Sequence, residues 1–215
     1  MKILSYNVRE WSRDLNPFSH NFWVWRYRRI RRFIQLTQPD VILFQELSFP
    51  ASLFIPRPYR KVPCKRTSHP VYLNTDKLRM RSAKVVAQTS HYLYLLLVDA
   101  IGRTTHIVNV HGTWIANEAV AMLHHIDELI EPKWIQPRLC VIAGDFNITP
   151  GDVKRLCNAR IYNTCLVKHP TYTVPANGAE VILDHAYTNV GETVCWPAYI
   201  GWEIRSDHVP VFIQY

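Results

Sequence analysis

Residues 139–147, which read L-C-V-I-A-G-D-F-N, constrain the fold of this chain more than any other segment. Their first five residues have the length and β-branched content of a buried strand, and Gly144 ends the apolar run. Side chains two residues apart in an extended chain lie on the same face, so Asp145 and Asn147 are expected to project together from the strand end. This placement favours a functional site, and a turn in which Asp and Asn bond local backbone groups is the alternative.

Three other predicted strands also end in polar residues. The strands are expected at residues 3–8, 41–44 and 106–110, and their polar ends are Asn7, Glu46 and His111. Each residue alone has an ordinary explanation, because asparagine forms turns, a carboxylate can be ion-paired, and a histidine at a strand end is more often structural than catalytic. Their recurrence favours one shared site.

The rest of the pattern predicts an α/β fold of alternating short strands and amphipathic helices. Helical spacing of apolar residues begins at Trp23 and stops before Pro39, and a second helix over residues 119–130 is closed by Pro132. Further strands are expected at residues 71–73, 84–89, 92–98, 181–183 and 209–213, with Gly102 in a hairpin connection. The strand at 181–183 leads to Asp184, and the last strand follows Asp207 and His208. No internal repeat or linker is evident, so residues 1–215 are expected to form a single domain.

The charge balance indicates an anionic partner. The chain carries 25 Lys and Arg against 17 Asp and Glu, a net charge of +8, which suits nucleic acid, a phosphorylated small molecule or an anionic membrane surface. Five arginines lie within residues 26–32. Such a run is usually a solvated helix face, and contact with substrate phosphates is the alternative, with Arg9, Arg26 and Arg29 as the candidates.

Cysteine content and hydropathy indicate the compartment. The five cysteines are odd in number and lack C-x-x-C spacing, so neither a zinc site nor a disulfide framework is indicated. No apolar run approaches the roughly 20 residues of a membrane span, and the N-terminal residues lack the apolar core of a signal peptide. We therefore expect a monomer without a transmembrane segment, in an intracellular, cytoplasmic setting.

The polar strand ends share one chemistry. Carboxylates beside neutral amides suit a hard, oxygen-preferring cation, Mg²⁺ or alternatively Mn²⁺. Histidines beside such an ion can stabilise a phosphoryl oxygen that gains charge in the transition state, and a further carboxylate can keep a histidine oriented and cationic. Metal-assisted hydrolysis of a phosphoester uses all of these parts.

Six motifs carry a family resemblance. In chain order they are S-Y-N-V, P-D-V-I-L-F-Q-E, V-N-V-H-G, G-D-F-N, L-D-H and S-D-H-V-P-V. Together they resemble the endonuclease/exonuclease/phosphatase superfamily typified by deoxyribonuclease I, from Ser5 to Val211. The resemblance implies a four-layer αββα sandwich of two mixed sheets face to face, with helices outside and the site at one end.

The resemblance also implies residue roles. Glu46 is the expected principal metal ligand, with Asn7 and Asp207 in or near the coordination shell. Asp145 is expected to activate or align the attacking water, and Asn147 to position the phosphate or the nucleophile. His208, oriented by Asp184, and His111 are the expected histidines on the scissile phosphate.

Differences from two other branches of the superfamily narrow the range of expected substrates. Abasic-site endonucleases usually carry an acidic residue where this chain has Arg9 and a tyrosine at the position of His111, and the Asp-Arg pair of inositol 5-phosphatases is replaced by Asp184-His185. We therefore expect a metal-dependent nuclease, acting on DNA ahead of RNA. A phosphatase or phosphodiesterase acting on phosphoinositide, sphingomyelin or another small phosphoester is the alternative.

Overall fold

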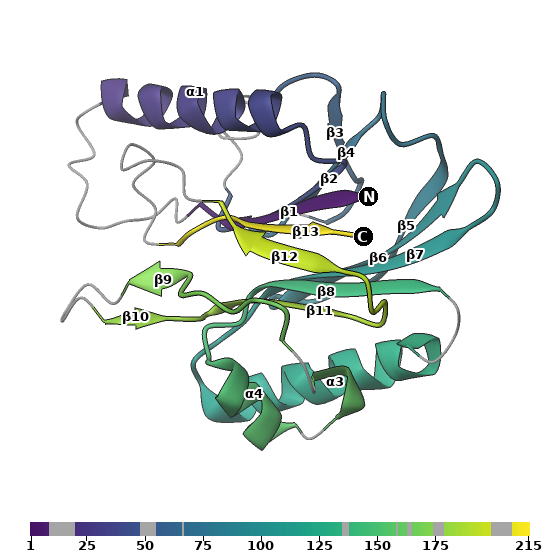
Figure 1. Cartoon of the computed structure of the whole chain (residues 1–215), viewed down its shortest axis with the longest axis vertical. Helices are drawn as coiled ribbons and strands as arrows, with labels where there is room; N and C mark the ends of the chain where they lie inside the picture. The colour runs from purple at the N-terminus through teal and green to yellow at the C-terminus, as the bar shows by residue number, and fades with distance from the viewer. Residues whose placement is uncertain are drawn as a thin grey trace.

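Two mixed β-sheets face each other, with helices on their outer faces (Figure 1). The computed structural model describes residues 1–8, 20–47, 55–65, 67–134, 138–157, 159–162, 165–173, 179–198 and 208–215, and it describes only the backbone for residues 20–26 and 173. The four-layer α/β sandwich that the resemblance implies is confirmed.

The first sheet has six strands in the order β12-β13-β1-β2-β4-β3. They are β1 (Lys2–Asn7), β2 (Val41–Gln45), β3 (Tyr59–Lys61), β4 (Val71–Asn74), β12 (Val194–Pro197) and β13 (Val211–Gln214). Ile3 on β1 pairs with Val41 on the parallel strand β2 and with Ile213 on the antiparallel strand β13. Strands from opposite ends of the sequence are therefore neighbours in this sheet.

The second sheet has five strands in the order β11-β8-β7-β6-β5. They are β5 (Met80–Gln88), β6 (Tyr92–Asp99), β7 (Thr104–His111), β8 (Leu139–Asp145) and β11 (Asp184–Thr188). The connection between β6 and β7 contains Gly102, as expected for a hairpin, while β7 and β8 are parallel. The short strands β9 (Tyr172–Thr173) and β10 (Glu180–Val181) pair separately.

Strand direction determines where polar strand ends can meet. Each sheet contains one parallel pair, β1 with β2 and β7 with β8, and β1 contacts β8 while β2 contacts β7 between the sheets. The carboxyl ends of these four strands therefore lie at one end of the sandwich, away from Met1 and Tyr215, which are joined by a 2.8 Å hydrogen bond at the other end (Figure 1).

Alternation along the strands divides the apolar side chains between three layers. Residues such as Ile3, Leu43, Leu95 and Val141 fill the space between the sheets. Their neighbours along each strand point outward and are covered by helices, so nearly every strand residue of β1, β2 and β8 is buried. Strands buried on both faces explain why the sequence shows continuous apolar runs at these positions.

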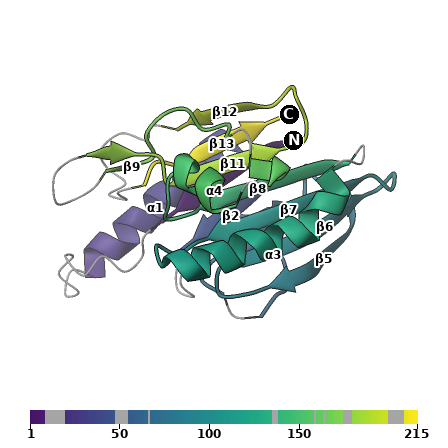
Figure 2. The same ribbon diagram turned by 90° about the horizontal axis from the view of Figure 1, so that it is seen from below.

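Helices cover both outer faces. Helix α1 (His20–Thr37) packs Tyr27, Ile30 and Ile34 on the first sheet, which confirms the expected amphipathic helix. Helix α3 (Ala116–Trp134), helix α4 (Pro150–Leu156) and the 3₁₀ turn η1 (Arg160–Tyr162) cover the second sheet, as the view from below shows (Figure 2). None of the described helices has the length and apolar character needed to cross a membrane.

Two boundaries differ from the sequence prediction. Asp184 begins β11 instead of ending a strand at 181–183, because it pairs with Asp145 on the antiparallel strand β8. Pro132 lies inside the last turn of α3 instead of closing the helix. Its fixed φ is compatible with a helix, and because α3 ends two residues later at Trp134, only the hydrogen bond of the missing Pro132 N–H is lost.

Candidate active site

Seven of the predicted site residues lie at the end of the sandwich where β1, β2, β7 and β8 finish. They are Asn7, Glu46, His111, Asp145, Asn147, Asp184 and His208. Four others are not placed there: Arg9, Asp207 and the side chain of Arg26 fall outside the described part of the chain, and Arg29 belongs to α1 on the outer face of the first sheet.

Asn7 joins the two sheets at this end. Its side-chain Nδ2 donates to Glu46 Oε1 at 3.0 Å and to Asp145 Oδ2 at 2.8 Å. Asn7 is completely buried as the last residue of β1, and Asp145 is the last residue of β8 in the opposite sheet. One amide thus holds two carboxylates close together, which would otherwise repel each other.

Glu46 follows β2 in a left-handed conformation, with φ +55°. This uncommon backbone geometry turns the chain away from the sheet directly after the buried Gln45. Burial raises the pKa of Glu46, but hydrogen bonds from His111 and Asn7 outweigh it, so the pKa is lowered from its ordinary value. The group is therefore a carboxylate at neutral pH, with His111 Nε2 3.6 Å from its Oε1.

His208 lies between two buried carboxylates. Its Nδ1 is 2.8 Å from Asp184 Oδ2, and its Nε2 is 3.8 Å from Asp145 Oδ2. Burial lowers the pKa of His208, but the charge and hydrogen bond of Asp184, with further help from Asp145, raise it to about 9. The ring is therefore an imidazolium at neutral pH, oriented by Asp184.

Asp145 has both oxygens engaged. Oδ2 faces Asn7 and His208, and Oδ1 accepts the backbone N–H of Asn147 at 2.8 Å. Burial raises the pKa of Asp145 to about 6, against the opposing charge of His208. The group is mostly ionised at neutral pH, yet it remains a stronger base than an exposed aspartate.

Asn147 corrects one expectation from the sequence. The strand ends at Asp145, and Asn147 adopts φ +56°, so the two side chains do not follow the alternation of an extended chain. The local turn that the sequence offered as the alternative is present, because Asp145 accepts from Asn147 N, and the same carboxylate also faces Asn7. The Asn147 side chain donates to Gly112 O at 3.1 Å, which ties this turn to the segment after β7.

Two glycines permit the close approach of β7 and β8. Gly144 has φ +146°, and a Cβ there would lie 2.0 Å from the carbonyl oxygen of Val110. A Cβ on Gly112 would lie 2.3 Å from the carbonyl oxygen of Phe146. Both contacts are with backbone atoms that cannot move aside, so the position of His111 beside Asp145 depends on these glycines.

Thr171 supports the site and was not identified from the sequence. It is fully buried, and its Oγ1 accepts the backbone N–H groups of Leu183 at 3.2 Å and Asp184 at 3.0 Å. Its carbonyl accepts from Val209 N, next to His208. Thr171 therefore fixes Asp184 relative to His208, and no local pattern in the sequence predicts this role.

A buried amide pair behind the site was also missed. Gln45 Nε2 donates to Asn109 Oδ1 at 2.6 Å, and Asn109 Nδ2 donates to the carbonyls of Phe44 at 2.9 Å and His69 at 3.0 Å. Gln45 directly precedes Glu46, and Asn109 lies two residues before His111. Two amides next to site residues inside apolar strands are a sequence signal that could have found this pair.

Two overlapping groups of side chains could hold a cation, since within each group the ligand atoms lie within 4.8 Å of one another. They are Glu46, His111 and Asp145, and Asp145, Asp184 and His208. The imidazolium of His208 already supplies positive charge to the second group. The first group fits a hard cation better, because Glu46 and Asp145 offer carboxylate oxygens and rotation of the Asn7 amide would add a third oxygen.

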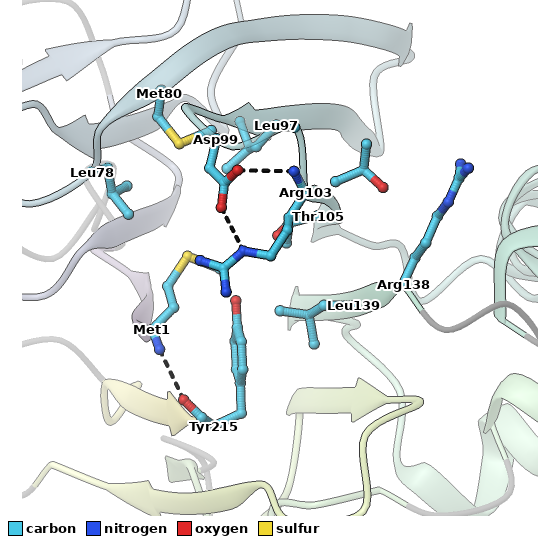
Figure 3. Close-up of a pocket in the computed structure, with 12 residues that line it drawn as sticks. Met1, Leu78, Met80, Leu97, Asp99, Arg103, Thr105, Arg138, Leu139 and Tyr215 are labelled. Carbon is cyan, nitrogen blue, oxygen red and sulfur yellow. Dashed lines mark hydrogen bonds and ion pairs between the residues drawn. The ribbon is translucent and has the colours of Figure 1, made fainter.

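A cavity of about 650 Å³ lies at the opposite end of the sandwich (Figure 3). Its lining includes Met1 and Tyr215 together with Arg103, whose Nε is 2.7 Å from Asp99 Oδ2. The charge of Arg103 is therefore balanced within the chain. None of the seven residues gathered at the other end contributes to this lining.

The family model for the endonuclease/exonuclease/phosphatase family matches residues 5–208. The chain belongs to this family. Its enzymes are phosphoester hydrolases and generally depend on divalent metal ions, which agrees with the carboxylate and histidine cluster described above. A comparison with curated protein sequences finds no match.

Solved structures share the fold at low sequence identity. Zebrafish (D. rerio) TDP2 humanized by 14 mutations is 15% identical with a TM-score of 0.72, and a family protein from Bacteroides vulgatus is 19% identical with a TM-score of 0.71; each alignment covers 99% of this chain and 97% of the other. A mannosyl-6-phosphatase from Bacteroides thetaiotaomicron is 16% identical with a TM-score of 0.69, covering 100% and 98%.

Proposed function

We propose that the protein is a Mg²⁺-dependent phosphodiesterase that hydrolyses nucleic acid, with DNA preferred to RNA and Mn²⁺ able to replace Mg²⁺. The observation that carries the proposal is the position of His208, a cationic ring held by Asp184 and facing Asp145 beside the group formed by Asn7, Glu46 and His111. A candidate base, a fixed positive charge and candidate metal ligands would thus act at one place.

Glu46 and Asn7 would hold the cation, with Asp207 as a further candidate from the sequence. When bound, the cation would withdraw charge from a phosphoryl oxygen and so make the phosphorus a better electrophile. Asn7 orients Glu46 and Asp145 through its Nδ2, and it would rotate to present its side-chain oxygen to the cation.

Asp145 would align a water molecule and accept its proton as the water oxygen attacks phosphorus in line with the leaving oxygen. The raised pKa suits this task, since a carboxylate with a pKa of about 6 is both ionised and basic at neutral pH. The bond from phosphorus to the leaving oxygen breaks, and that oxygen takes a proton from solvent. Asn147 would position the phosphate or the water.

His208 and His111 would bind the phosphoryl oxygens on which negative charge accumulates. Because Asp184 keeps His208 charged, this stabilisation is present before the reaction begins. Arg9, Arg26 and Arg29 remain proposed contacts for more distant substrate phosphates. The net charge of +8 and a related structure, D. rerio TDP2 complexed with a single-strand DNA product, support nucleic acid as the substrate.

The alternative is a phosphatase or phosphodiesterase of a small phosphoester. The fold similarity to a mannosyl-6-phosphatase favours it, since that enzyme matches this chain over its whole length. A phosphoinositide or sphingomyelin would also present a phosphoester to the same groups. These substrates differ from nucleic acid outside the reacting phosphorus, so a substrate panel separates them.

The test measures hydrolysis with Mg²⁺ and with EDTA of supercoiled plasmid, single-stranded DNA, RNA, mannose 6-phosphate, phosphoinositide and sphingomyelin. Asp145→Ala and His208→Ala are expected to lower activity at least about 100-fold, since each removes a group that acts on the reacting atoms. His124→Ala and Glu128→Ala alter exposed side chains of α3 and serve as matched controls. Turnover of a small phosphoester without cleavage of any nucleic acid would overturn the nuclease proposal.

A further inference from the structure

The surface beside His111 extends the candidate active site along the second sheet. Strand β6 is antiparallel to β7 and begins at Tyr92, opposite Val110, so His91 lies next to His111 at the same sheet edge. The backbone N–H of His111 donates to His91 O at 2.7 Å. The row of polar residues that starts at Asp184 and Asp145 therefore continues through His111 to His91.

The segment 112–115, between β7 and α3, is fixed to the site by its backbone. Gly112 N donates to Asp145 O at 2.7 Å, and Gly112 O accepts from the Asn147 side chain. Thr113 Oγ1 accepts the N–H of Ile115 at 3.2 Å, which closes a small turn around Trp114. The position of Trp114 is therefore set by the same hydrogen bonds that hold Asp145.

Trp114, on this segment, is 78% exposed as a residue. Single exposed apolar residues are ordinary on protein surfaces, and described examples such as Leu36 and Ile101 belong to other parts of the chain. Trp114 differs because it follows His111 by three residues and is adjacent to Ile115, which is also exposed. An exposed aromatic residue three positions after His111 is available to contact a ligand that reaches beyond the candidate active site.

Polar groups next to this segment limit what the ligand can be. Glu118, in the first turn of α3, has its Oε2 3.7 Å from His91 Nε2. The Glu118 carboxylate disfavours a second phosphate or an anionic lipid surface, because like charges repel. An acyl chain is disfavoured as well, because it would cover the imidazole and the carboxylate without forming hydrogen bonds with them. A flat ring with polar edges suits these side chains, since it can stack on the indole of Trp114 and form hydrogen bonds with His91 or Glu118.

We propose that Trp114, His91 and Glu118 form a subsite for an unpaired nucleobase adjacent to the scissile phosphate. This inference rests on the proposed function and narrows the substrate to single-stranded nucleic acid, because a base within a duplex does not offer a free face for stacking. Trp114 acts as a specificity residue that binds the nucleoside and leaves the chemical step to Asp145 and His208.

The test compares two single-stranded oligonucleotides with the same phosphates, one with ordinary bases and one with tetrahydrofuran abasic residues around a single cleavage position. The proteins are the wild type, Trp114→Ala, Trp114→Phe and the control Ile101→Ala, whose exposed residue lies in the hairpin before Gly102. Trp114→Ala is expected to raise KM about tenfold for the base-bearing strand, with kcat nearly unchanged. It should leave KM for the abasic strand unchanged, and Trp114→Phe should retain most of the base preference.

Other outcomes overturn the inference in distinguishable ways. An equal rise of KM on both strands would mean that Trp114 does not recognise the base, and no change on either would mean that it contacts no substrate. If Trp114→Ala lost activity on sphingomyelin vesicles but cleaved both oligonucleotides as the wild type does, Trp114 would be assigned to a membrane surface. Cleavage of supercoiled plasmid but of neither single strand would overturn this inference alone, whereas failure of the wild type to cleave any nucleic acid would overturn the proposed nuclease function.

Discussion

His208 is a buried ring whose charge is set by its neighbours, with Asp184 at 2.8 Å as the main one. A buried imidazole without such a partner loses its proton, and His69 illustrates this, because burial lowers its pKa to about 4. At neutral pH, His69 is therefore neutral and His208 is positively charged. The difference lies in the carboxylates that face His208, with Asp184 foremost, rather than in the depth of burial.

Replacing Asp184 with asparagine is expected to lower the pKa of His208 from about 9 to a value near or below the ordinary 6.5, since burial is then less opposed. The imidazolium, which the proposed function requires, would be lost as pH rises through this lower value. NMR titration of His208 in EDTA measures the pKa, and the alkaline limb of kcat/KM should move to lower pH. Asp152→Asn, at an exposed ion pair with Arg155, is the control, and an unchanged limb in Asp184→Asn would contradict the prediction.

Gly144→Ala is expected to destabilise the protein by about 3 kcal/mol or more, because the added Cβ would overlap Val110 O and the φ of +146° suits only glycine. Urea denaturation measures the loss. Gly191→Ala provides the comparison, since a Cβ there meets no atom within 4 Å and should change stability by less than about 0.5 kcal/mol. Equal effects of the two substitutions would show that the contact between β7 and β8 tolerates a side chain.

At the scale of elements, the sequence predicts what depends on local pattern. Apolar runs locate the strands, the 3–4 spacing locates α1, and the polar ends of β1, β7 and β8 identify Asn7, His111 and Asp145. Thr171 could not be predicted, because its role comes from hydrogen bonds to residues 12 and 13 positions away. Asp184 was identified but placed on the wrong strand end, since only pairing with β8 decides where β11 starts.

The hydrogen bond between Gln45 and Asn109 links β2 to β7. Asn189 is a suitable comparison, because it is an amide with a similar number of hydrogen bonds elsewhere in the fold. It accepts from Cys140 N and donates to the carbonyls of Trp134 and Arg138. Asn109→Ala should cost about 2–4 kcal/mol in unfolding free energy, because it leaves buried polar groups without partners. It should also lower kcat, since Glu46 and His111 lose their common support.

Asn189→Ala should reduce stability while leaving kcat unchanged at a temperature where both variants are folded. The contacts of Asn189 involve the start of β8, at the end of the sandwich away from Asp145. Equal kcat values for the wild type and Asn109→Ala would show that the amide pair contributes to stability alone.

On the scale of the whole molecule, helices α1 and α3, which lie on opposite outer faces, differ in charge. Helix α1 exposes Arg28, Arg31 and Arg32, whereas α3 exposes Glu118, Glu128 and Glu131. A polyanion approaching from solvent would therefore meet a more favourable potential on the side of the first sheet. A small neutral ligand would sense little of this difference.

If nucleic acid is the substrate, its affinity should fall steeply with salt. Each phosphate contact adds about 0.7 to the slope of log affinity against log salt for single strands, and about 0.9 for B-DNA. Binding of single-stranded DNA to Asp145→Ala, followed by fluorescence anisotropy at several salt concentrations, measures the slope. A slope near zero would contradict a role for the positive surface, and Arg28→Ala with Arg31→Ala should lower the slope if α1 contributes.

The pairing of β1 with β13 has a consequence for how the chain is made. Strand β1 leaves the ribosome first, but its partner β13 and the histidine that precedes it, His208, are made some 200 residues later. Until then Asn7 lies on a strand with one side unpaired, and Asp184 has no ring to orient. The contacts of His208 with Asp184 and Asp145 can therefore form only after residue 208 has been made, so this cluster of side chains assembles late in synthesis.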